Sequence, residues 1–302
     1  MAASPMGTSD ACPACESPLS SSGAAALCSA CGARFRRAAD GLLSAFDSPH
    51  GVEYPEDGAE LTAQVEEISF WFRHRNAVLC ALLDRYSPNG ALWDVGGGNG
   101  FQALCFQREG RPVVLVEPGA AGCRTARARG VRRVVQATLG SLRLPPSSVA
   151  AFSLLDVIEH LVEPGRLLAE CARVLRPGGR LYVTVPAYPW LWSDEDVYAR
   201  HQRRYTRASL ERELRAQGFA LEYVGYYFQF LVAPILLVRS LPYRLTAWRR
   251  SRGELKMDQS EHAPGGTLRR ILDARLSNEL DAIKRGRQLK FGSSLLAVAV
   301  KA

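Results

Sequence analysis

Four cysteines near the N-terminus are spaced as ligands of a single metal ion. Cys12, Cys15, Cys28 and Cys31 read C-x2-C-x12-C-x2-C. Each C-x2-C pair can form a tight turn that points both sulfurs at one ion, and four thiolates in a tetrahedron suit zinc. Four protein ligands leave no open position, so the spacing predicts a structural zinc ion. A redox C-x-x-C pair and disulfides are the alternatives, and two matched pairs in a reducing compartment argue against both.

A second candidate site is a run of glycines that follows a short apolar stretch. Its members, Asp94, Gly96, Gly98 and Gly100, are spaced D-x-G-x-G-x-G. Between a strand and a helix, such a loop lets backbone N–H groups approach a ligand without meeting a Cβ atom. The loop also fits the dinucleotide fingerprint G-x-G-x-x-G/A through Ala103, and a plain tight turn is the remaining alternative. Asp94 would repel a pyrophosphate and attract a cationic head group, while Glu117 can accept hydrogen bonds from ribose hydroxyls.

Histidines and carboxylates follow two later apolar stretches that read as strands, residues 149–155 and 181–185. Asp156, Glu159 and His160 stand in the sequence D-V-I-E-H, and Asp196 and His201 come later. Histidine and carboxylate side chains in a pocket can act as general bases. We therefore take His160, His201 and Asp196 as the candidate catalytic residues. The alternative is structural, because Asp156 and Glu159 can form the capping box of a short helix with His160 as a packed or solvated residue.

The elements that must position these residues alternate between strands and helices. The expected strands are Ala91–Val95, Pro112–Val116, Val131–Val135, Val149–Leu155, Leu181–Val185, Ala220–Tyr226 and Ser294–Lys301. The expected helices are Leu61–Tyr86, Phe101–Gln107, Ala120–Arg129, Glu163–Leu175 and Thr206–Gln217. This alternation predicts an α/β fold with a mostly parallel sheet and helices on both faces. Ligands of such sheets bind at the carboxyl ends of the strands.

The chain divides into three parts by composition and pattern. We expect a zinc ribbon over residues 1–46, a linker with an N-terminal helical segment over 47–86, and the main domain over 87–302. Substrate-side insertions are expected at about 186–206 and 229–290. The aromatic and apolar stretch Tyr223–Val238 is either an interfacial wall for a lipid-like substrate or a buried strand and helix.

Composition and charge indicate which classes of partner and which cellular location suit the protein. The formal net charge is +8 with 23% charged residues, and a basic balance suits nucleic acid, an anionic membrane surface or an anionic substrate. Residues 1–10 lack the basic and apolar parts of a signal peptide. No run of about 20 apolar residues is present to span a bilayer. The expected location is therefore cytoplasmic, with peripheral membrane contact as a further expectation.

The glycine loop resembles the first motif of class I S-adenosylmethionine (SAM)-dependent methyltransferases, and Glu117 matches their second-strand acidic residue. The resemblance covers about residues 70–302. It implies a Rossmann-like, seven-stranded sheet that binds SAM. Asp94 and the backbone of Gly96, Gly98 and Gly100 would hold the methionine end and Glu117 the ribose. Adenine would lie near Ala137 and Thr138, with Leu155 in the same SAM-binding set. Many relatives carry an aspartate near Thr138, and this chain does not.

Two further segments resemble particular methyltransferases. The D-V-I-E-H segment is similar to that of the ubiquinone-biosynthesis O-methyltransferases, in which the acidic residues and histidine are associated with magnesium. The segment from Pro186 to Thr206 resembles a bacterial subgroup that reads P-A-Y-x-W-L-W-S-x-H-D and then G-H-x-R-R-Y-T. This chain has Glu195 where that group often has histidine and Arg200 where it often has glycine.

Together these resemblances imply methyl transfer to a small-molecule or lipid-linked metabolite, with O-methylation favoured. An rRNA or tRNA methyltransferase is the second interpretation, because some rRNA guanine methyltransferases place a zinc site before a class I core and a net charge of +8 suits a phosphate backbone. A non-catalytic binding module is the third, and the intact pattern of Asp94, the glycines and Glu117 argues against it.

Overall fold

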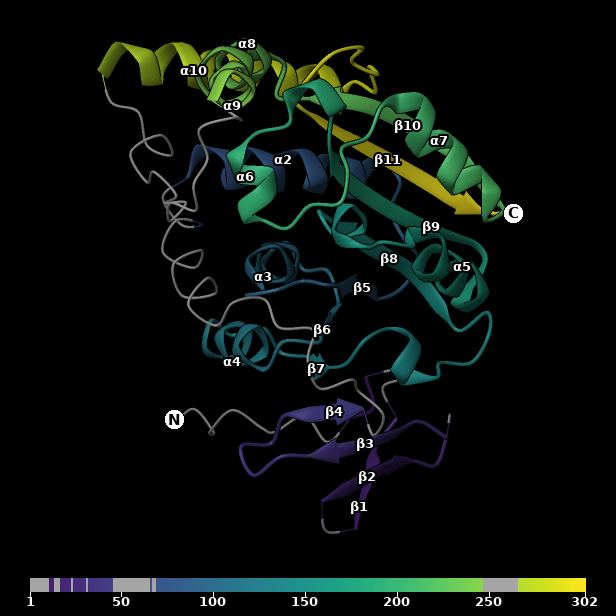
Figure 1. Ribbon diagram of the computed structural model, residues 1–302. Coiled ribbons are helices and arrows are strands. Elements are labelled where there is room, and N and C mark those ends of the chain that lie inside the picture. The colour runs from purple at the N-terminus through teal and green to yellow at the C-terminus, as the bar shows by residue number, and fades with distance from the viewer. Residues whose placement is uncertain are drawn as a thin grey trace.

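One mixed sheet runs through the molecule with helices on both of its faces (Figure 1). The computed structural model describes residues 11–13, 17–22, 24–30, 32–45, 66, 69–246 and 266–302. The strand order is β1-β2-β3-β4-β7-β6-β5-β8-β9-β11-β10. The strands are β1 Leu19–Ser22, β2 Ala25–Cys28, β3 Arg34–Arg37, β4 Leu43–Ala45, β5 Leu92–Val95, β6 Val113–Glu117, β7 Val134–Gln136, β8 Val149–Leu155, β9 Leu175–Pro186, β10 Phe219–Tyr227 and β11 Ser294–Lys301.

The central strands of the sheet are parallel, and the strand order reverses direction between β5 and β8. Strands β6 and β7 follow on one side of β5, and β8 and β9 follow on the other, all in parallel pairs. All four residues of β5 are buried, as expected of a strand covered on both faces. The crevice outside the carboxyl ends of β5 and β8 is the place where open α/β sheets bind ligands.

Helices cover both faces of the sheet, and the sheet separates two hydrophobic cores. The helices are α2 Phe70–Arg85, α3 Phe101–Arg108, α4 Ala120–Ala128, α5 Pro164–Val174, α6 Asp194–Tyr198, α7 Arg207–Ala216, α8 Val232–Pro234, α9 Leu241–Thr246 and α10 Gly266–Lys284. Helices α5 and α7 pack into one core, and α2, α3, α4 and α10 contribute to the other. The predicted alternation of strands and helices over residues 91–227 is therefore confirmed, with small shifts at element ends.

The expected sheet of seven strands is too small, because the N-terminal segment extends it. Strands β1 to β4 form an antiparallel meander, and β4 then pairs in parallel with β7 through Leu43 and Ser44. This pairing covers the edge of β7, which would otherwise present unpaired backbone groups. The sequence pattern of the four short strands carried no signal for this long-range pairing.

Two of the predicted zinc ligands can be placed. Cys12 and Cys28 are fully buried, while Cys15 and Cys31 lie outside the described residues, as does most of the expected linker. The Cys12 N–H donates to the Ser17 carbonyl at 2.7 Å, and the Cys28 N–H donates to the Ala33 carbonyl at 2.9 Å. Each of the two cysteines thus donates a backbone hydrogen bond to the carbonyl of the residue five positions later.

The described parts of the expected insertion, residues 229–246 and 266–290, are mostly helical. Helix α10 packs against α2, and the imidazole Nε2 of His74 lies 2.8 Å from Oε1 of Glu279. Glu279 also accepts hydrogen bonds from the backbone N–H groups of Phe228 and Gln229 at 2.6 and 2.8 Å. Within the described part of the chain, no helix is both long and apolar enough to cross a bilayer.

Candidate active site

The glycine loop between β5 and α3 has a backbone that side chains would disturb. Gly96, Gly98 and Gly100 have φ angles of 74°, 52° and 74°, which lie in the left-handed region. A Cβ on Gly100 would lie 2.7 Å from the Cβ of Ala126, so this glycine allows α3 and α4 to pack closely. A Cβ on Gly98 would have no atom within 4 Å. Gly98 therefore forms the open side of the loop, where a ligand can approach the main chain.

Asp94 is buried with one oxygen lacking a partner. Its Oδ1 accepts a hydrogen bond from the Ser153 hydroxyl at 2.8 Å. Its Oδ2 is buried and has no hydrogen-bond partner within the described part of the chain. Burial raises the pKa of Asp94 to about 6, against the opposing effects of the Ser153 hydrogen bond and the Arg75 charge. A buried carboxylate oxygen without a partner can accept a hydrogen bond from a cationic group of a ligand.

Glu117 ties the glycine loop to the next strand-to-helix loop. Its carboxylate accepts hydrogen bonds from the N–H groups of Gly98 at 2.9 Å and Gly119 at 2.7 Å. Burial raises its pKa in spite of these bonds. A carboxylate offers about four acceptor positions, so two remain for the predicted ribose contact. Sequence reasoning had not anticipated that Glu117 also supports the loop.

The remaining predicted SAM contacts lie at the same edge of the sheet. Thr138 follows β7, and its backbone N–H donates to the Ser141 hydroxyl at 3.1 Å. Leu155 is the last residue of β8 and is half-buried. The structure thus brings the carboxyl ends of β5, β6, β7 and β8 together, and the adenine contact of Thr138 stays a prediction.

Arg75 of α2 is a central residue that the sequence did not reveal. Its guanidinium is buried, donates a hydrogen bond to Oδ2 of Asp156, and lies 4.5 Å from the centre of the Trp71 ring. Asp156 also accepts a hydrogen bond from the Thr184 hydroxyl at 3.1 Å and has a φ of 57°. In the sequence, Arg75 is only an arginine close to the aromatic residues of α2. No motif with a defined spacing points to its role.

These contacts exclude the capping-box interpretation of the D-V-I-E-H segment. The residues Ile158–His160 form a 3-10 turn with Val157 at its N-cap and no side-chain cap. Asp156 is committed to Arg75 and Thr184, and both carboxylate oxygens of Glu159 are buried without hydrogen-bond partners among the described residues. Glu159 is therefore not a helix cap.

We expect Arg75→Met to lower the free energy of unfolding by about 3–5 kcal/mol, since it leaves the Asp156 carboxylate without its cationic partner in a buried site. Urea denaturation measures the change. Arg73→Met is the matched control, because Arg73 is exposed on the same helix and its loss should cost less than about 0.5 kcal/mol. Equal effects of the two substitutions would show that Arg75 acts only as a helix residue.

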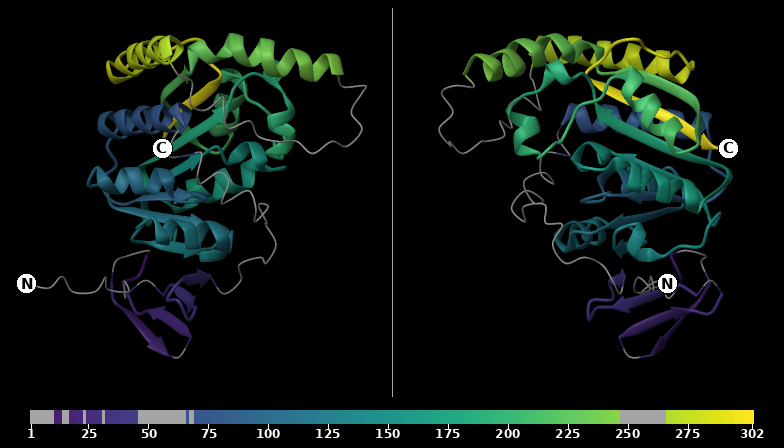
Figure 2. Two further views of the ribbon diagram at one scale, coloured as in Figure 1. Left: turned by 90° about the vertical axis from the view of Figure 1, so that its left-hand side faces the viewer. Right: turned by 45° about the vertical axis from the view of Figure 1, so that its right-hand side comes forward.

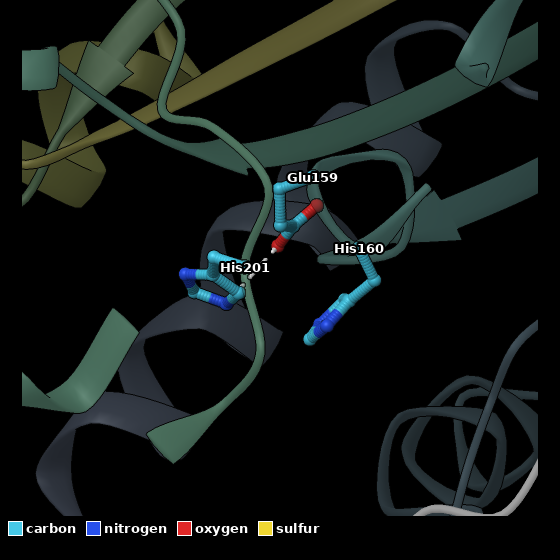
Figure 3. Close-up of side chains that lie close together, drawn as sticks. All are labelled: Glu159, His160 and His201. Atoms are coloured by element: carbon cyan, nitrogen blue, oxygen red, sulfur yellow. Dashed lines mark ion pairs between the residues drawn. The ribbon is translucent and has the colours of Figure 1, made fainter. Parts of the chain in front are cut away.

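Three polar residues that the sequence analysis singled out lie close together beside the glycine loop. Glu159, His160 and His201 come from the turn after β8 and from the segment after α6 (Figure 3). The ring centres of His160 and His201 are 4.7 Å apart, and Nε2 of His201 lies 4.0 Å from Oε1 of Glu159. The neighbouring Val157 packs against the loop, because a Cβ on Gly96 would lie 2.8 Å from its Cγ2. The segment that carries Glu159 and His160 therefore lies directly beside the glycine loop.

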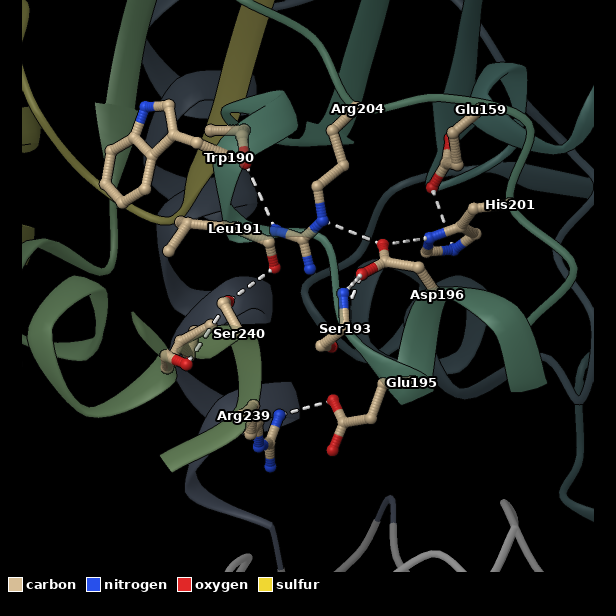
Figure 4. Close-up of polar contacts among 12 residues, drawn as sticks. Glu159, Trp190, Leu191, Ser193, Glu195, Asp196, His201, Arg204, Arg239 and Ser240 are labelled. Atoms are coloured by element: carbon tan, nitrogen blue, oxygen red, sulfur yellow. Dashed lines mark hydrogen bonds and ion pairs between the residues drawn. The ribbon is translucent and has the colours of Figure 1, made fainter. Parts of the chain in front are cut away.

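Asp196 orients His201. Its Oδ1 lies 2.8 Å from Nδ1 of His201 and accepts a hydrogen bond from Nε of Arg204 at 2.8 Å (Figure 4). Its Oδ2 accepts one from the Ser193 N–H at 2.8 Å, in the observed capping box of α6. Burial opposes ionisation of Asp196, but the His201 hydrogen bond and the Arg204 charge outweigh it and lower its pKa. The ionised carboxylate makes Nδ1 the protonated nitrogen of neutral His201, which leaves Nε2 as a proton acceptor.

His160 and Glu159 have different electrostatic environments. Burial and the neighbouring His201 lower the pKa of His160 to about 4, so it stays neutral at physiological pH. Burial and the charge of Asp156 raise the pKa of Glu159 well above its usual range. His201 has the Asp196 carboxylate placed to stabilise a proton on its ring.

The same cluster offers donors for a metal ion. Glu159, His160 and His201 each present one ligand atom, and these atoms lie within 4.8 Å of one another. The sequence had grouped Asp156 with Glu159 and His160, but Asp156 is held by Arg75. Two imidazole nitrogens and one carboxylate suit zinc or iron, whereas magnesium prefers oxygen ligands. The donor set therefore does not fit the magnesium that the resemblance implied.

Comparisons with known proteins agree with this geometry. Residues 93–183 match the family model described as a methyltransferase domain. A Mycobacterium tuberculosis protein named a probable S-adenosylmethionine-dependent methyltransferase is 36% identical over 119 residues, which are 39% of this chain and 43% of that protein. A ubiquinone biosynthesis O-methyltransferase of Xylella fastidiosa is 30% identical over 107 residues, which are 33% of this chain and 44% of that protein.

The chain thus spans less than half the length of these two relatives. The fold extends further, since a solved SAM-dependent methyltransferase of Thermotoga maritima is similar with a TM-score of 0.52 and 20% identity. That similarity covers 82% of this chain and 97% of the Thermotoga protein. The glycine loop and Asp94 lie inside the matched domain, with an open approach at Gly98 and a buried carboxylate oxygen that a SAM ammonium group would satisfy. Residues 93–183 therefore match the methyltransferase domain found in relatives named as SAM-dependent methyltransferases, and the fold around them is that of a solved enzyme of this kind.

Proposed function

We propose that this chain transfers a methyl group from SAM to an oxygen atom of a small-molecule or lipid-linked metabolite. The observation that carries the proposal is the Asp196–His201 pair beside the glycine loop, with its Nδ1–Oδ1 distance of 2.8 Å. A hydroxyl acceptor must lose a proton during the transfer, and a histidine oriented by a carboxylate is suited to take it.

Some residues of the site would hold SAM, and others would take the proton of the acceptor. When bound, SAM supplies a methyl group on a sulfonium that leaves as a neutral thioether. Asp94 Oδ2 would pair with the ammonium of the cofactor, and the open backbone at Gly98 would contact its methionine part. Nε2 of His201 accepts the hydroxyl proton as the new carbon–oxygen bond forms, and Asp196 stabilises the resulting imidazolium. Correct alignment of the acceptor oxygen supplies most of the remaining acceleration.

The test is to incubate the protein with methyl-labelled SAM and fractionated extracts of its source cells. We expect label in the small-molecule or lipid fraction, in a product whose methyl group sits on oxygen by mass spectrometry. Heat-inactivated protein and extract without added protein are the controls. Label in RNA, with a rate that falls steeply as salt is raised, would contradict the proposal and favour the RNA methyltransferase interpretation.

We also propose that the N-terminal knuckles bind one structural zinc ion through Cys12, Cys15, Cys28 and Cys31. The matching backbone hydrogen bonds of the buried Cys12 and Cys28 support this. Purified protein should contain about one zinc per chain, and Cys12→Ser should lose it because a structural site needs all four ligands. Elemental analysis measures both. Cys80→Ser, in α2 and outside the set, should keep the metal, and a metal-free wild-type protein with folded β1–β4 would refute the site.

A further inference from the structure

One end of the molecule carries an unusually apolar and exposed helical surface. We call residues 232–246 the apolar helix; it consists of α8, a π-helical stretch Ile235–Ser240 and α9. The side chains of Leu237 and Val238 are each 62% exposed and that of Leu245 is 72% exposed. Together with α10, the apolar helix lies at the end of the molecule opposite β1–β4 (Figures 1 and 2).

The apolar helix is firmly attached, so its exposure is not a sign of loose packing. The Ser240 hydroxyl donates to the Leu191 carbonyl at 2.9 Å, and Arg244 donates to the Trp190 carbonyl at 2.9 Å. Arg239 forms an ion pair with Glu195 (Figure 4). These contacts turn one side of the helix toward the segment before α6 and leave Leu237, Val238 and Leu245 facing outward.

Basic residues outnumber acidic ones in the described part of this surface. Residues 232–246 include two arginines and no acidic residue. Helix α10 adds the exposed Arg270 and Arg275, and its exposed Arg269 forms an ion pair with Asp273. Two aromatic side chains, Trp190 and Phe230, are also partly exposed near the helix. Apolar side chains with flanking arginines and aromatic rings are the features of helices that lie in the interface of an anionic membrane.

We propose that the apolar helix binds the surface of an anionic lipid membrane. Leu237, Val238 and Leu245 enter the boundary between head groups and acyl chains, and Arg270 and Arg275 of α10 meet the lipid phosphates. A second copy of the chain would bury the same apolar atoms, but it would place these arginines against one another. The charge therefore favours the lipid surface over a dimer.

Membrane binding would also favour one class of methyl acceptor, lipid-linked molecules. This point rests on the proposed function. The apolar helix contacts Trp190, Leu191 and Glu195, and Glu195 directly precedes the Asp196 that orients His201. A lipid-linked acceptor held in the membrane can thus present its polar head to the site while its apolar chain stays in the bilayer.

The test is flotation of the full chain with vesicles of phosphatidylcholine and phosphatidylglycerol at a 70:30 ratio, compared with pure phosphatidylcholine. We expect binding to the anionic vesicles that weakens with added salt. The double variant Leu237→Glu with Leu245→Glu should lower the partition coefficient at least about tenfold, because two exposed leucines lose their insertion. Leu27→Glu, on the exposed side of β2 at the opposite end, should bind as the wild type does.

Binding needs no acceptor and no SAM, so its outcome is independent of whether the methyl-transfer proposal holds. A wild-type protein that stays monomeric and does not float with anionic vesicles would overturn the inference. A dimer in sedimentation that the double variant separates into monomers would also overturn it, in favour of a second copy as the occupant. Thermal unfolding should show that both variants keep the wild-type fold.

Discussion

Asp94→Asn is expected to abolish SAM-dependent stabilisation of the protein while making the SAM-free form more stable. The Asp94 carboxylate is buried, with one oxygen bonded to Ser153 and the other without a partner among the described residues. Asparagine keeps the acceptor for Ser153 and removes the buried charge. We expect SAM affinity to fall at least about 100-fold, because the ammonium loses a desolvated charge partner.

The sign of the stability change follows from the pKa of Asp94. Burial raises that pKa from 3.8 to about 6, so the folded protein holds a proton more tightly than the unfolded chain. Stability of the SAM-free protein therefore falls as pH rises from about 4 through 6, by up to about 3 kcal/mol. Asp94→Asn removes this cost, and at pH 8 its SAM-free form should melt a few degrees higher than wild type.

Calorimetric titration with SAM and thermal unfolding with and without SAM measure the two effects. Wild-type affinity should also weaken below pH 6, as Asp94 becomes protonated, while the variant shows no such dependence. Asp281→Asn, an exposed aspartate of α10, is the control and should bind SAM normally. Retained SAM affinity in Asp94→Asn would refute the placement of the ammonium at this carboxylate.

The parts of the fold that depend on local pattern were predictable from the sequence. Glycines at Gly96, Gly98 and Gly100 are required by positive φ angles, and such a requirement leaves a direct trace in residue type. The start of the helix expected at Thr206 also has a local cause, since the Thr206 hydroxyl accepts a hydrogen bond from the Ser209 N–H at 3.1 Å. Buried central strands such as β5 likewise appear as short apolar runs.

Features that depend on distant partners were not predictable. Arg75 meets Asp156 across 81 positions of sequence, and His74 meets Glu279 across 205. The D-x-x-E spacing favoured a helix cap, but the positive φ of Asp156 and its Arg75 partner gave a different turn. The parallel pairing of β4 with β7 had no local signal for the same reason. Long-range ion pairs are selected by the folded geometry, and residue spacing does not record them.

The candidate catalytic residues were predictable in part: their residue types stand out in the sequence, but their contacts do not. His160, His201 and Asp196 were found by residue type, and the structure brings them together beside the loop. Their individual roles come only from geometry. Asp196 supports His201 through a hydrogen bond, whereas burial and the neighbouring His201 lower the pKa of the half-buried His160 to about 4.

His201→Ala is therefore expected to lower the rate of methyl transfer by about 100-fold to 10,000-fold, the usual contribution of a general base. SAM affinity should change less than about twofold, since His201 lies outside the ammonium site. The rate is measured with the labelled fraction that wild type methylates, and the affinity by calorimetry. Asp196→Asn should also lower the rate, because asparagine cannot stabilise the imidazolium.

Two comparisons separate proton transfer from a packing role. Added imidazole should restore part of the rate of His201→Ala and none of the rate of Asp196→Asn, since only the first variant lacks the ring. His160→Ala should lower turnover by a smaller factor with SAM affinity intact, because a histidine with a pKa of about 4 is a weak base. A His201→Ala protein that is folded and as active as wild type would exclude His201 as the base. A larger loss in His160→Ala, rescued by imidazole, would transfer that role to His160.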